Sequence, residues 1–330
     1  MEPLLQIESL TVQYHANREI VHAVTNIDLS IHKGESLGLV GETGAGKTTT
    51  ALSILRLLPN QTGKITSGKI IFQGQNLLEL TEEDMRAVRG SGASMIFQDP
   101  MTSLNPVMSV SSQIYEVLYY HNYENLSRAE MEAKVGRLLE LVGIPASRGN
   151  EYPHQFSGGM KQRIGIAIAL ACEPALLIAD EPTTALDVTI QAQVLSMMND
   201  LRKKLDTSVL LITHDLGVVA KMCQNVAIMY AGEIIEYGQA RDIYKGDRHH
   251  PYTVGLFGSI PNLKDKTERL NAIPGLMPDP TRTPPGCSFF PRCPRRMAVC
   301  GSQKPDVSVR DGHMVRCHHY FQGEERAHHV

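Results

Sequence analysis

One short segment, Gly41-Glu42-Thr43-Gly44-Ala45-Gly46-Lys47-Thr48, matches the pattern G-x-x-x-x-G-K-[ST] at every position. Its glycines allow a tight turn that brings backbone N–H groups up to phosphate oxygens, an approach that side chains would obstruct. The lysine supplies a positive charge and the final threonine a hydroxyl ligand for Mg²⁺. The segment therefore predicts a phosphate-binding loop (P-loop), with nucleotide contacts expected from Gly41, Glu42, Thr43, Gly44, Ala45, Gly46, Lys47, Thr48 and Thr49.

The residues on either side of the P-loop predict a strand followed by a helix. Residues 36–40 are mostly apolar and suit a buried strand, and residues 49–58 carry apolar side chains at helical spacing. This order places bound phosphates at the N-terminus of a helix, where free N–H groups and the helix dipole favour anions. The chain is therefore predicted to belong to the α/β class.

A second strand, further along the chain, is predicted to end in two carboxylates. Residues 176–181 read Leu-Leu-Ile-Ala-Asp-Glu, an apolar run typical of a strand buried on both faces. Ligands of open α/β sheets lie at the carboxyl ends of the strands. We therefore expect Asp180 to hold Mg²⁺ and Glu181 to act as the base, or to orient the water, in attack on a phosphate.

Length and composition limit the class of protein. A chain of 330 residues predicts a large nucleotide-binding unit with an appended piece, and a net charge of −3 offers no basic surplus for nucleic acid. The N-terminus shows no basic region followed by an apolar stretch, so export is not expected. The longest near-apolar tract, 164–179, is interrupted by Glu173 and Pro174 and is shorter than the roughly 18 to 20 residues that span a bilayer. We expect a cytosolic protein that acts at a membrane only as a peripheral subunit.

The most discriminating motif lies between the P-loop and the acidic strand. Residues 154–163, His-Gln-Phe-Ser-Gly-Gly-Met-Lys-Gln-Arg, resemble the signature sequence of ATP-binding cassette (ABC) proteins. Ser157, Gly158 and Gly159 are expected to offer a hydroxyl and backbone N–H groups at the start of a helix over 160–171. Phe156 stands where that family usually has Leu, and Met160 where many members have Gln, but the Ser-Gly-Gly backbone is intact.

Further matches to the ABC family follow in the family's order. Gln98 resembles the glutamine that senses Mg²⁺ or water, and residues 184–187 resemble the loop that crosses the dimer interface. His214 resembles the switch histidine near the γ-phosphate, and Tyr14 is placed like the aromatic residue that stacks on adenine. The resemblance implies catalytic roles for Glu181, His214 and Gln98, and Mg²⁺ contacts for Thr48, Gln98 and Asp180.

The resemblance also implies the architecture and the assembly. We expect a RecA-like P-loop core with an antiparallel β subdomain near the N-terminus, forming a nucleotide-binding domain over 1–240, with a helical signature subdomain at about 101–163. A Cys-rich extension is expected over 241–330. In this family ATP lies between two subunits, so that the P-loop of one faces the signature of the other.

Three further stretches narrow the subfamily. Residues 99–106, 179–193 and 249–253, the last reading His-His-Pro-Tyr-Thr, resemble the ATPases of bacterial dipeptide and oligopeptide importers, and nickel and opine importers share much of this pattern. The implied partners are a second ATPase subunit, commonly a paralogue, two transmembrane permeases and an extracytoplasmic solute-binding protein. The implied location is the cytoplasmic face of the cell (inner) membrane. A soluble cassette ATPase that acts on nucleic acid would use the same nucleotide site, but the acidic balance and the His-Pro-Tyr-Thr element argue against that class.

Four of the six cysteines lie in a Pro-rich segment with the spacing C-x₅-C-x₆-C-x₁₆-C. Disulfides are disfavoured in a reducing cytosol. Four soft thiolates in so little chain suggest a metal site that organises a segment otherwise short of core. The expected ligands are Cys287, Cys293, Cys300 and Cys317.

The spacing alone leaves the metal open. Zinc sites usually show closely spaced C-x₂₋₄-C pairs, which are absent here. A [4Fe–4S] cluster tolerates wider spacing, and its charge could be offset by Arg292, Arg295, Arg296 and Arg316. Thiols without a metal, or mixed ligation with His313, His318 or His319, would also fit the spacing. Some dipeptide-importer ATPases carry a [4Fe–4S] cluster with this kind of layout, so the resemblance favours that cluster over Zn²⁺ and implies a structural or regulatory role.

Overall fold

The computed structural model describes residues 2–16, 18–99, 103–122, 125–184, 186–259 and 273–320. Parts of two stretches that resemble the importer ATPases, residues 100–102 and 185, lie outside this range. The chain forms two compact units. The P-loop unit comprises residues 2–30, 37–78 and 213 onward, and the helical unit comprises residues 31–36 and 79–212. The expected site residues are therefore divided between two units, each assembled from separate stretches of the sequence.

The P-loop unit contains an antiparallel sheet built from the N-terminal strands. Its strand order is β2-β1-β4-β5, from β1 (Leu5–Ala16), β2 (Glu19–Ile31), β4 (Gly63–Phe72) and β5 (Gln75–Asn76). Leu5 pairs with Phe72 at one end of the β1–β4 ladder and Tyr14 pairs with Gly63 at the other. The antiparallel β subdomain expected near the N-terminus is therefore present.

A second group of strands in the P-loop unit carries the nucleotide loop. Their order is β11-β12-β10-β9-β3, from β3 (Ser36–Val40), β9 (Asn225–Tyr230), β10 (Glu233–Gln239), β11 (Ser308–Arg310) and β12 (His313–Val315). β3 runs parallel to β9, and all five residues of β3 are buried, as its apolar sequence predicts. The helices of this unit are α1 (Lys47–Ile54), α8 (Leu216–Met222), α9 (Ala240–Lys245) and α10 (Pro251–Gly258).

Two glycines fix the path of the P-loop. Gly46 has a φ of 106°, and a Cβ there would lie 2.4 Å from the carbonyl oxygen of Ala23. A Cβ on Gly41 would lie 2.2 Å from the carbonyl oxygen of Met229. Because Gly46 turns the chain directly into helical geometry, α1 begins at Lys47, earlier than the start at residue 49 that the apolar spacing predicts, and ends at Ile54.

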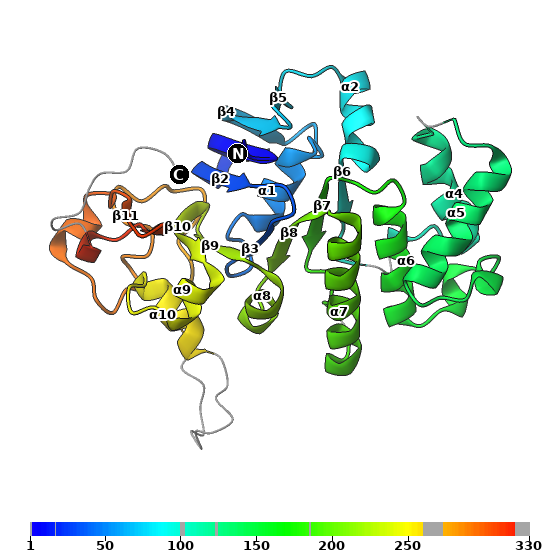
Figure 1. Ribbon diagram of the computed structural model, residues 1–330. Helices are drawn as coiled ribbons and strands as arrows, with labels where there is room; N and C mark the ends of the chain where they lie inside the picture. The colour runs from blue at the N-terminus through cyan, green and yellow to red at the C-terminus, as the bar shows by residue number, and fades with distance from the viewer. Residues whose placement is uncertain are drawn as a thin grey trace. The chain divides into compact units, whose positions relative to one another are not determined.

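The helical unit combines three parallel strands with a helical bundle. Its strands follow the order β8-β7-β6, from β6 (Ala93–Ile96), β7 (Leu176–Asp180) and β8 (Ser208–Thr213). Its helices are α2 (Glu82–Ala87), followed by a π turn (Val88–Gly92), α4 (Val110–Tyr120), α5 (Arg128–Leu141), α6 (Gly158–Leu170) and α7 (Val188–Leu205). Figure 1 shows α4, α5 and α6 side by side.

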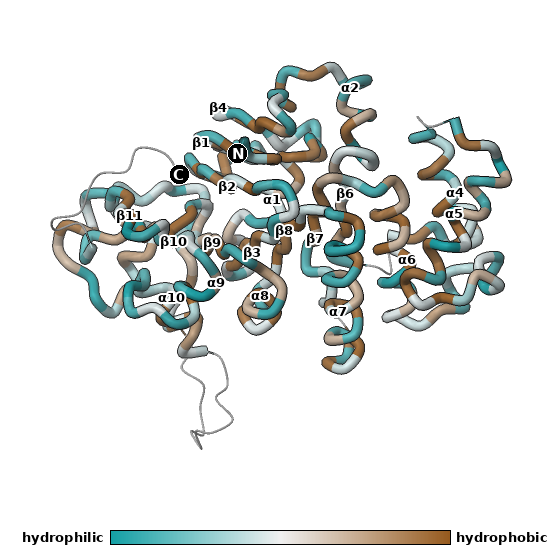
Figure 2. The backbone as a smooth tube through the Cα atoms, in the orientation of Figure 1, coloured by the Kyte–Doolittle hydropathy of each residue, from teal (hydrophilic) through white to brown (hydrophobic). Residues whose placement is uncertain are grey.

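Local sequence explains where these helices begin. Ser109, Ser127 and Ser157 each cap a helix by accepting a hydrogen bond from the backbone N–H three residues later, and Ser127 completes a capping box with Glu130. Because Ser157 is the cap, α6 begins at Gly158, two residues before the predicted start. Hydrophobic and hydrophilic residues alternate along α7, which buries one face (Figure 2).

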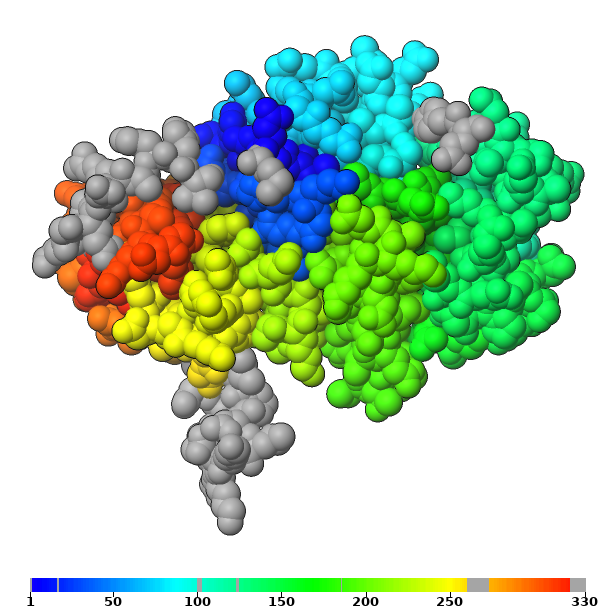
Figure 3. All heavy atoms as spheres, in the orientation of Figure 1, coloured from blue at the N-terminus to red at the C-terminus, as the bar shows by residue number. Residues whose placement is uncertain are grey.

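The described residues of the C-terminal segment, 273–320, add little regular structure to the P-loop unit. Besides β11 and β12 these residues form two short 3₁₀ turns, Ala298–Gly301 and His318–Tyr320. In Figure 3 their orange and red atoms pack against the yellow atoms of α9 and α10. Arg248 joins the two parts, because its guanidinium donates to the carbonyl oxygen of His313 at 3.0 Å and stacks over the ring of Tyr320 at 5.2 Å. The C-terminal segment is therefore bonded to the unit that carries the P-loop.

Candidate active site

The P-loop holds its lysine in place through backbone carbonyls. Nζ of Lys47 donates to the carbonyl oxygens of Gly41, at 2.8 Å, and Glu42, at 3.0 Å, and the side chain is buried. Thr43, Gly44 and Thr48 are exposed. The loop therefore presents its tip and the expected Mg²⁺ hydroxyl to solvent, with the charged amine folded beneath them.

Tyr14 lies next to the start of α1. Its hydroxyl is 3.3 Å from Oγ1 of Thr49, and its backbone pairs with Gly63 in the sheet. The side chain is half-buried. The P-loop unit thus brings together two residues that the sequence assigned to the nucleotide, one near the end of β1 and one in the first turn of α1.

The acidic strand carries two carboxylates at its end, as the sequence predicts, and the structure shows one of them buried and the other accessible. Asp180 is the last residue of β7 and is 2% exposed, whereas Glu181 is half-buried and lies outside the strand. Glu181 has a φ of 46°, a left-handed conformation that is uncommon for residues other than glycine. Its N–H donates to the carbonyl oxygen of Ile212 at 2.8 Å, which fixes the turn.

The side chain of Glu181 is held by two neighbours. Nε2 of Gln98 donates to Oε2 of Glu181 at 3.0 Å, and Oγ1 of Thr184 donates to the same oxygen at 3.0 Å. The structure therefore brings together two of the three residues assigned to catalysis. The sequence did not predict the contact from Thr184, because residues 184–187 resemble the loop that crosses the dimer interface.

The signature residues begin a helix on the surface of the helical unit. Ser157 and Gly158 are exposed, and Oγ of Ser157 accepts a hydrogen bond from the N–H of Met160 at 3.4 Å. Gly159 has no room for a side chain, since a Cβ would lie 2.5 Å from Cγ2 of Ile190. This arrangement leaves a helix N-terminus open to a ligand from outside the chain.

The unusual Phe156 has a structural explanation. Its ring is buried, and the guanidinium of Arg148 stacks over it at 4.5 Å while also pairing with Glu151. Aromatic rings attract a guanidinium through their electron-rich face, which a leucine lacks. Phe156 therefore anchors the residues before the signature helix.

His214 follows β8 and is exposed. The next residue, Asp215, caps α8 by accepting hydrogen bonds from the N–H groups of Gly217, at 2.8 Å, and Val218, at 3.2 Å. The assigned residues fall into two groups. Tyr14, residues 41–49 and His214 belong to the P-loop unit, whereas Gln98, Asp180, Glu181 and residues 157–159 belong to the helical unit.

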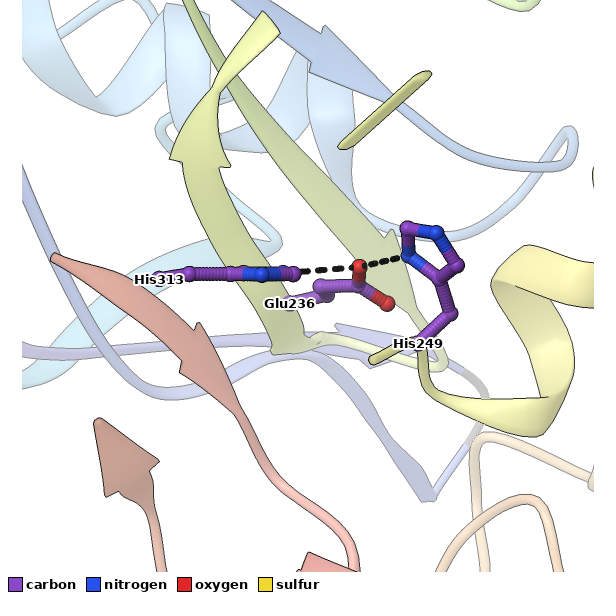
Figure 4. A group of neighbouring side chains, drawn as sticks. All are labelled: Glu236, His249 and His313. Carbon is purple, nitrogen blue, oxygen red and sulfur yellow. Dashed lines mark hydrogen bonds and ion pairs between the residues drawn. The ribbon is translucent and has the colours of Figure 1, made fainter. Parts of the chain in front are cut away.

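A buried carboxylate organises the His-His-Pro-Tyr-Thr element. Figure 4 shows Glu236 between the rings of His249 and His313, whose nearest nitrogens lie 2.8 and 3.0 Å from Oε1. Its second oxygen accepts hydrogen bonds from the N–H of His250, at 2.8 Å, and the hydroxyl of Thr253, at 2.6 Å. Burial alone would raise the pKa of Glu236, but these hydrogen bonds lower it to about 2.

The same geometry makes this cluster an ion pair and not a metal centre. Both ring nitrogens of His249 contact acceptors, Glu236 on one side and the carbonyl oxygen of Gly246, at 2.9 Å, on the other. Each nitrogen must then donate a proton, so the ring is an imidazolium, consistent with a pKa raised by the hydrogen bond to Glu236. A metal would need the lone pairs that these protons occupy.

The four cysteines of the C-terminal segment lie close enough for their charges to interact. Cys300 and Cys317 are buried and Cys287 and Cys293 are half-buried. Burial raises the pKa of Cys287 to about 11, and the remaining three thiols contribute to the rise. Within the described part of the chain, no three of these sulfurs lie within 4.8 Å of one another.

No helix among the described residues is long and apolar enough to cross a bilayer.

Two family models match this chain. One is described as ABC transporter and matches residues 24–184, and the other is described as oligopeptide/dipeptide transporter, C-terminal region, and matches residues 235–300. The chain is 47% identical to the dipeptide transport ATP-binding protein DppD of Bacillus subtilis (strain 168), over 100% of this chain and 98% of the relative. It is 45% identical to the oligopeptide transport ATP-binding protein OppD of Escherichia coli (strain K12), over 96% of this chain and 93% of the relative.

A solved structure shares the fold. The dimeric post-hydrolysis state of the ATP-binding cassette MJ0796, bound to ADP and Pi, matches with a TM-score of 0.65 and 25% identity, over 72% of this chain and 99% of that chain. The cassette fold expected from the motifs is therefore confirmed. The family models, the full-length relatives and the complete set of motifs agree, and the chain belongs to the ABC transporter family, among the ATP-binding proteins of dipeptide and oligopeptide importers.

Proposed function

We propose that this chain is the ATP-hydrolysing peripheral subunit of an importer for dipeptides or oligopeptides. The observation that carries the proposal is the hydrogen bond from Gln98 to Glu181, in a chain whose P-loop is complete and whose Lys47 is held in place. A cassette that only bound nucleotide would not need a carboxylate positioned in this way. The relatives are named as dipeptide and oligopeptide transport ATP-binding proteins, which supports a peptide as the transported solute.

Hydrolysis would be an in-line attack of water on the γ-phosphate. Lys47 and the N–H groups of the P-loop would stabilise the charge that develops on the phosphate oxygens. Glu181 would polarise the water, with its carboxylate oriented by Gln98 and Thr184, and His214 would contact the γ-phosphate. Thr48, Gln98 and Asp180 would hold Mg²⁺, which neutralises charge on the phosphates when bound. The oxygen atoms of these three side chains suit that hard cation.

The site would be completed by a second ATPase subunit, commonly a paralogue in such importers. The exposed Ser157 and Gly158 at the start of α6 support this arrangement, because they offer a hydroxyl and N–H groups that could contact a nucleotide held by the partner. The partner's signature would face the P-loop of this chain in the same way. Closure of the pair around ATP would then be the step that supplies work to the membrane subunits.

Two permease subunits would receive that work at a groove in the helical unit. The groove has a volume of about 300 Å³ and is lined by polar and apolar side chains from β6, α4, α6 and the loops beside them, among them Phe97, Leu104, His121 and Gln162. Gln98 directly follows Phe97, so a partner seated in the groove would lie one residue from the side chain that holds Glu181. The chain would therefore lie at the cytoplasmic face of the cell membrane, and a solute-binding protein outside would select the peptide.

The four-cysteine segment is proposed to hold a [4Fe–4S] cluster with a structural or regulatory role. All four ligands would be soft thiolates, which suit an iron–sulfur cluster, and the sequence lacks the closely spaced C-x₂₋₄-C pairs that zinc sites usually show. Burial raises the pKa of Cys293 and Cys317, but Arg295 opposes that rise and would offset cluster charge. Arg292, expected to share that role, is instead bonded to Glu42.

Purification of the native complex from the source cells, under anaerobic conditions, tests both proposals. We expect two ATPase chains and two permeases in equal amounts, and about four iron atoms for each copy of this chain with broad absorption in the visible blue. Recovery of the chain with nucleic acid, and without permeases, would contradict the transport role. A preparation that contains the permeases but no iron would contradict the cluster alone.

A further inference from the structure

We propose that Tyr252 of α10 and Arg292 of the C-terminal segment position the P-loop for nucleotide binding, because they hold the loop residue Glu42 from two directions. The inference rests on the proposed function, because it assigns a task within the same ATP site. It concerns residues that the loop pattern leaves unspecified, since Glu42 occupies one of the variable positions between Gly41 and Gly46.

Every polar group of Glu42 has a partner within the P-loop unit. Its N–H donates to the hydroxyl oxygen of Tyr252 at 3.0 Å, and its carboxylate accepts hydrogen bonds from both terminal nitrogens of Arg292, at 3.0 and 3.2 Å. Its carbonyl oxygen accepts from Nζ of Lys47 at 3.0 Å. Glu42 therefore connects the C-terminal segment directly to the lysine that the proposed reaction uses.

Arg292 is itself held firmly, so that it can act as a fixed point. Its Nε donates to the carbonyl oxygen of Pro274 at 3.1 Å, and its terminal nitrogens also reach the carbonyl oxygen of Ile273, at 3.3 Å, and the hydroxyl of Tyr230, at 3.4 Å. With the two bonds to Glu42, these contacts use all five N–H donors of a guanidinium. The Arg292 side chain is only 5% exposed and the Glu42 side chain 30%, so water reaches this pair mainly from the carboxylate side.

Tyr252 is placed by the first turn of α10. Its neighbour Pro251 occupies the first turn of α10, and Nδ1 of His250 caps that helix by accepting from the N–H of Tyr252 at 3.0 Å. The ring packs in a buried aromatic cluster with Tyr230 and Phe289, at centroid distances of 4.6 and 5.5 Å. The His-Pro-Tyr sequence therefore places the hydroxyl of Tyr252 next to the backbone of the P-loop.

The ion pair between Glu42 and Arg292 affects nucleotide binding through its charge. An unpaired Glu42 carboxylate on the loop would repel the phosphates and attract Lys47, whereas the paired carboxylate is neutralised and turned toward Arg292. Because bidentate pairing also fixes the orientation of the carboxylate, Arg292 sets the position of the carbonyl that holds Lys47. Arg292 and Tyr252 are thus positioning residues, which act on the nucleotide through Glu42.

The test compares nucleotide binding and turnover in the purified transporter complex. For Arg292→Met we expect the Kd for MgATP, and with it KM, to rise about tenfold, the order expected for lost hydrogen bonds to a charged group, while kcat at saturating ATP stays within about twofold. Tyr252→Phe, which keeps the ring packing, should raise the Kd about two- to fivefold for one lost hydrogen bond. Arg310→Met is the matched control, because Arg310 lies in the same segment and forms an exposed pair with Asp311, and it should leave the Kd unchanged.

A double variant separates positioning from a general loss of structure. In Glu42→Gln with Arg292→Met, the unpaired negative charge is gone, so most of the lost affinity should return. An unchanged Kd in Arg292→Met and Tyr252→Phe would overturn the inference, as would a loss in Arg292→Met that Glu42→Gln fails to restore. Failure of the wild-type complex to bind or hydrolyse ATP would instead overturn the proposed function.

Discussion

Replacement of Glu181 by Gln is expected to lower kcat for ATP hydrolysis by about 10²- to 10⁴-fold, the range for loss of a group that assists proton transfer. MgATP binding should persist, because Gln keeps the size of the side chain and can still accept a hydrogen bond from Gln98 or Thr184. The left-handed backbone at Glu181 is unaffected by this exchange, since both residues carry the same Cβ. Steady-state phosphate release by the assembled complex, at saturating MgATP, measures the effect.

The control for this variant is Glu140→Gln, an exposed residue of α5 in the same unit. It should hydrolyse ATP at the wild-type rate. Slow hydrolysis with retained nucleotide should also trap ATP in the Glu181→Gln complex, which a nucleotide exchange measurement detects. A Glu181→Gln complex that keeps more than about a tenth of wild-type turnover would show that another group activates the water.

Replacement of Glu236 by Ala is expected to cost about 3 to 5 kcal/mol of unfolding free energy, the range for breaking a buried ion pair from one side. The change leaves the imidazolium of His249 buried without its counter-charge and removes the acceptor for His313 and Thr253. Urea unfolding, followed by far-UV circular dichroism, should show the loss as a lower midpoint. Glu132→Ala, which breaks the exposed pair with Arg128 on α5, should leave the urea midpoint almost unchanged.

The difference in unfolding free energy between wild type and Glu236→Ala should depend on pH in a predictable direction. The pKa of Glu236 is lowered to about 2, so its contribution is present above the unfolded value of 4.5 and is lost as pH falls toward 2. The pKa of His249 is raised, so its contribution is present below 6.5 and is lost as pH rises through the raised value. The gap between wild type and Glu236→Ala should therefore be widest between about pH 5 and 6.5 and should narrow above that range. A gap in unfolding free energy that widens as pH rises above about 6.5 would contradict the ion pair.

Local sequence patterns predicted the parts of this chain that local physics determines. The apolar run at 36–40 forms the fully buried β3, and the run at 176–180 forms β7 with its carboxylate at the end. Helix boundaries were less accurate, because a glycine at 46 and a serine at 157 start their helices earlier than apolar spacing indicates. The ordered motifs identified the family, which the similarity to full-length relatives confirms.

Contacts between distant segments could not be predicted in this way. Glu42 and Arg292 are separated by 250 positions, and neither residue type signals the other. The sequence assigned Arg292 to the charge of a metal cluster because it precedes Cys293, but the fold turns its side chain toward the P-loop. The left-handed conformation of Glu181 was likewise unpredictable, since glutamate has no preference for it and the turn depends on a bond to Ile212 in β8.

The most direct test of the central proposal is ATP-dependent uptake of a labelled dipeptide or oligopeptide by the purified complex in lipid vesicles. Vesicles that contain this chain, its partner ATPase, the permeases and the solute-binding protein should accumulate peptide only with MgATP, and the Glu181→Gln substitution should abolish or strongly reduce uptake. ATP hydrolysis should rise when the peptide-loaded binding protein is added. The assignment of this chain as the ATP-hydrolysing subunit of a peptide importer would be contradicted by two results together. The rate of ATP hydrolysis would not change when the peptide-loaded binding protein is added, and peptide uptake would continue in the Glu181→Gln complex.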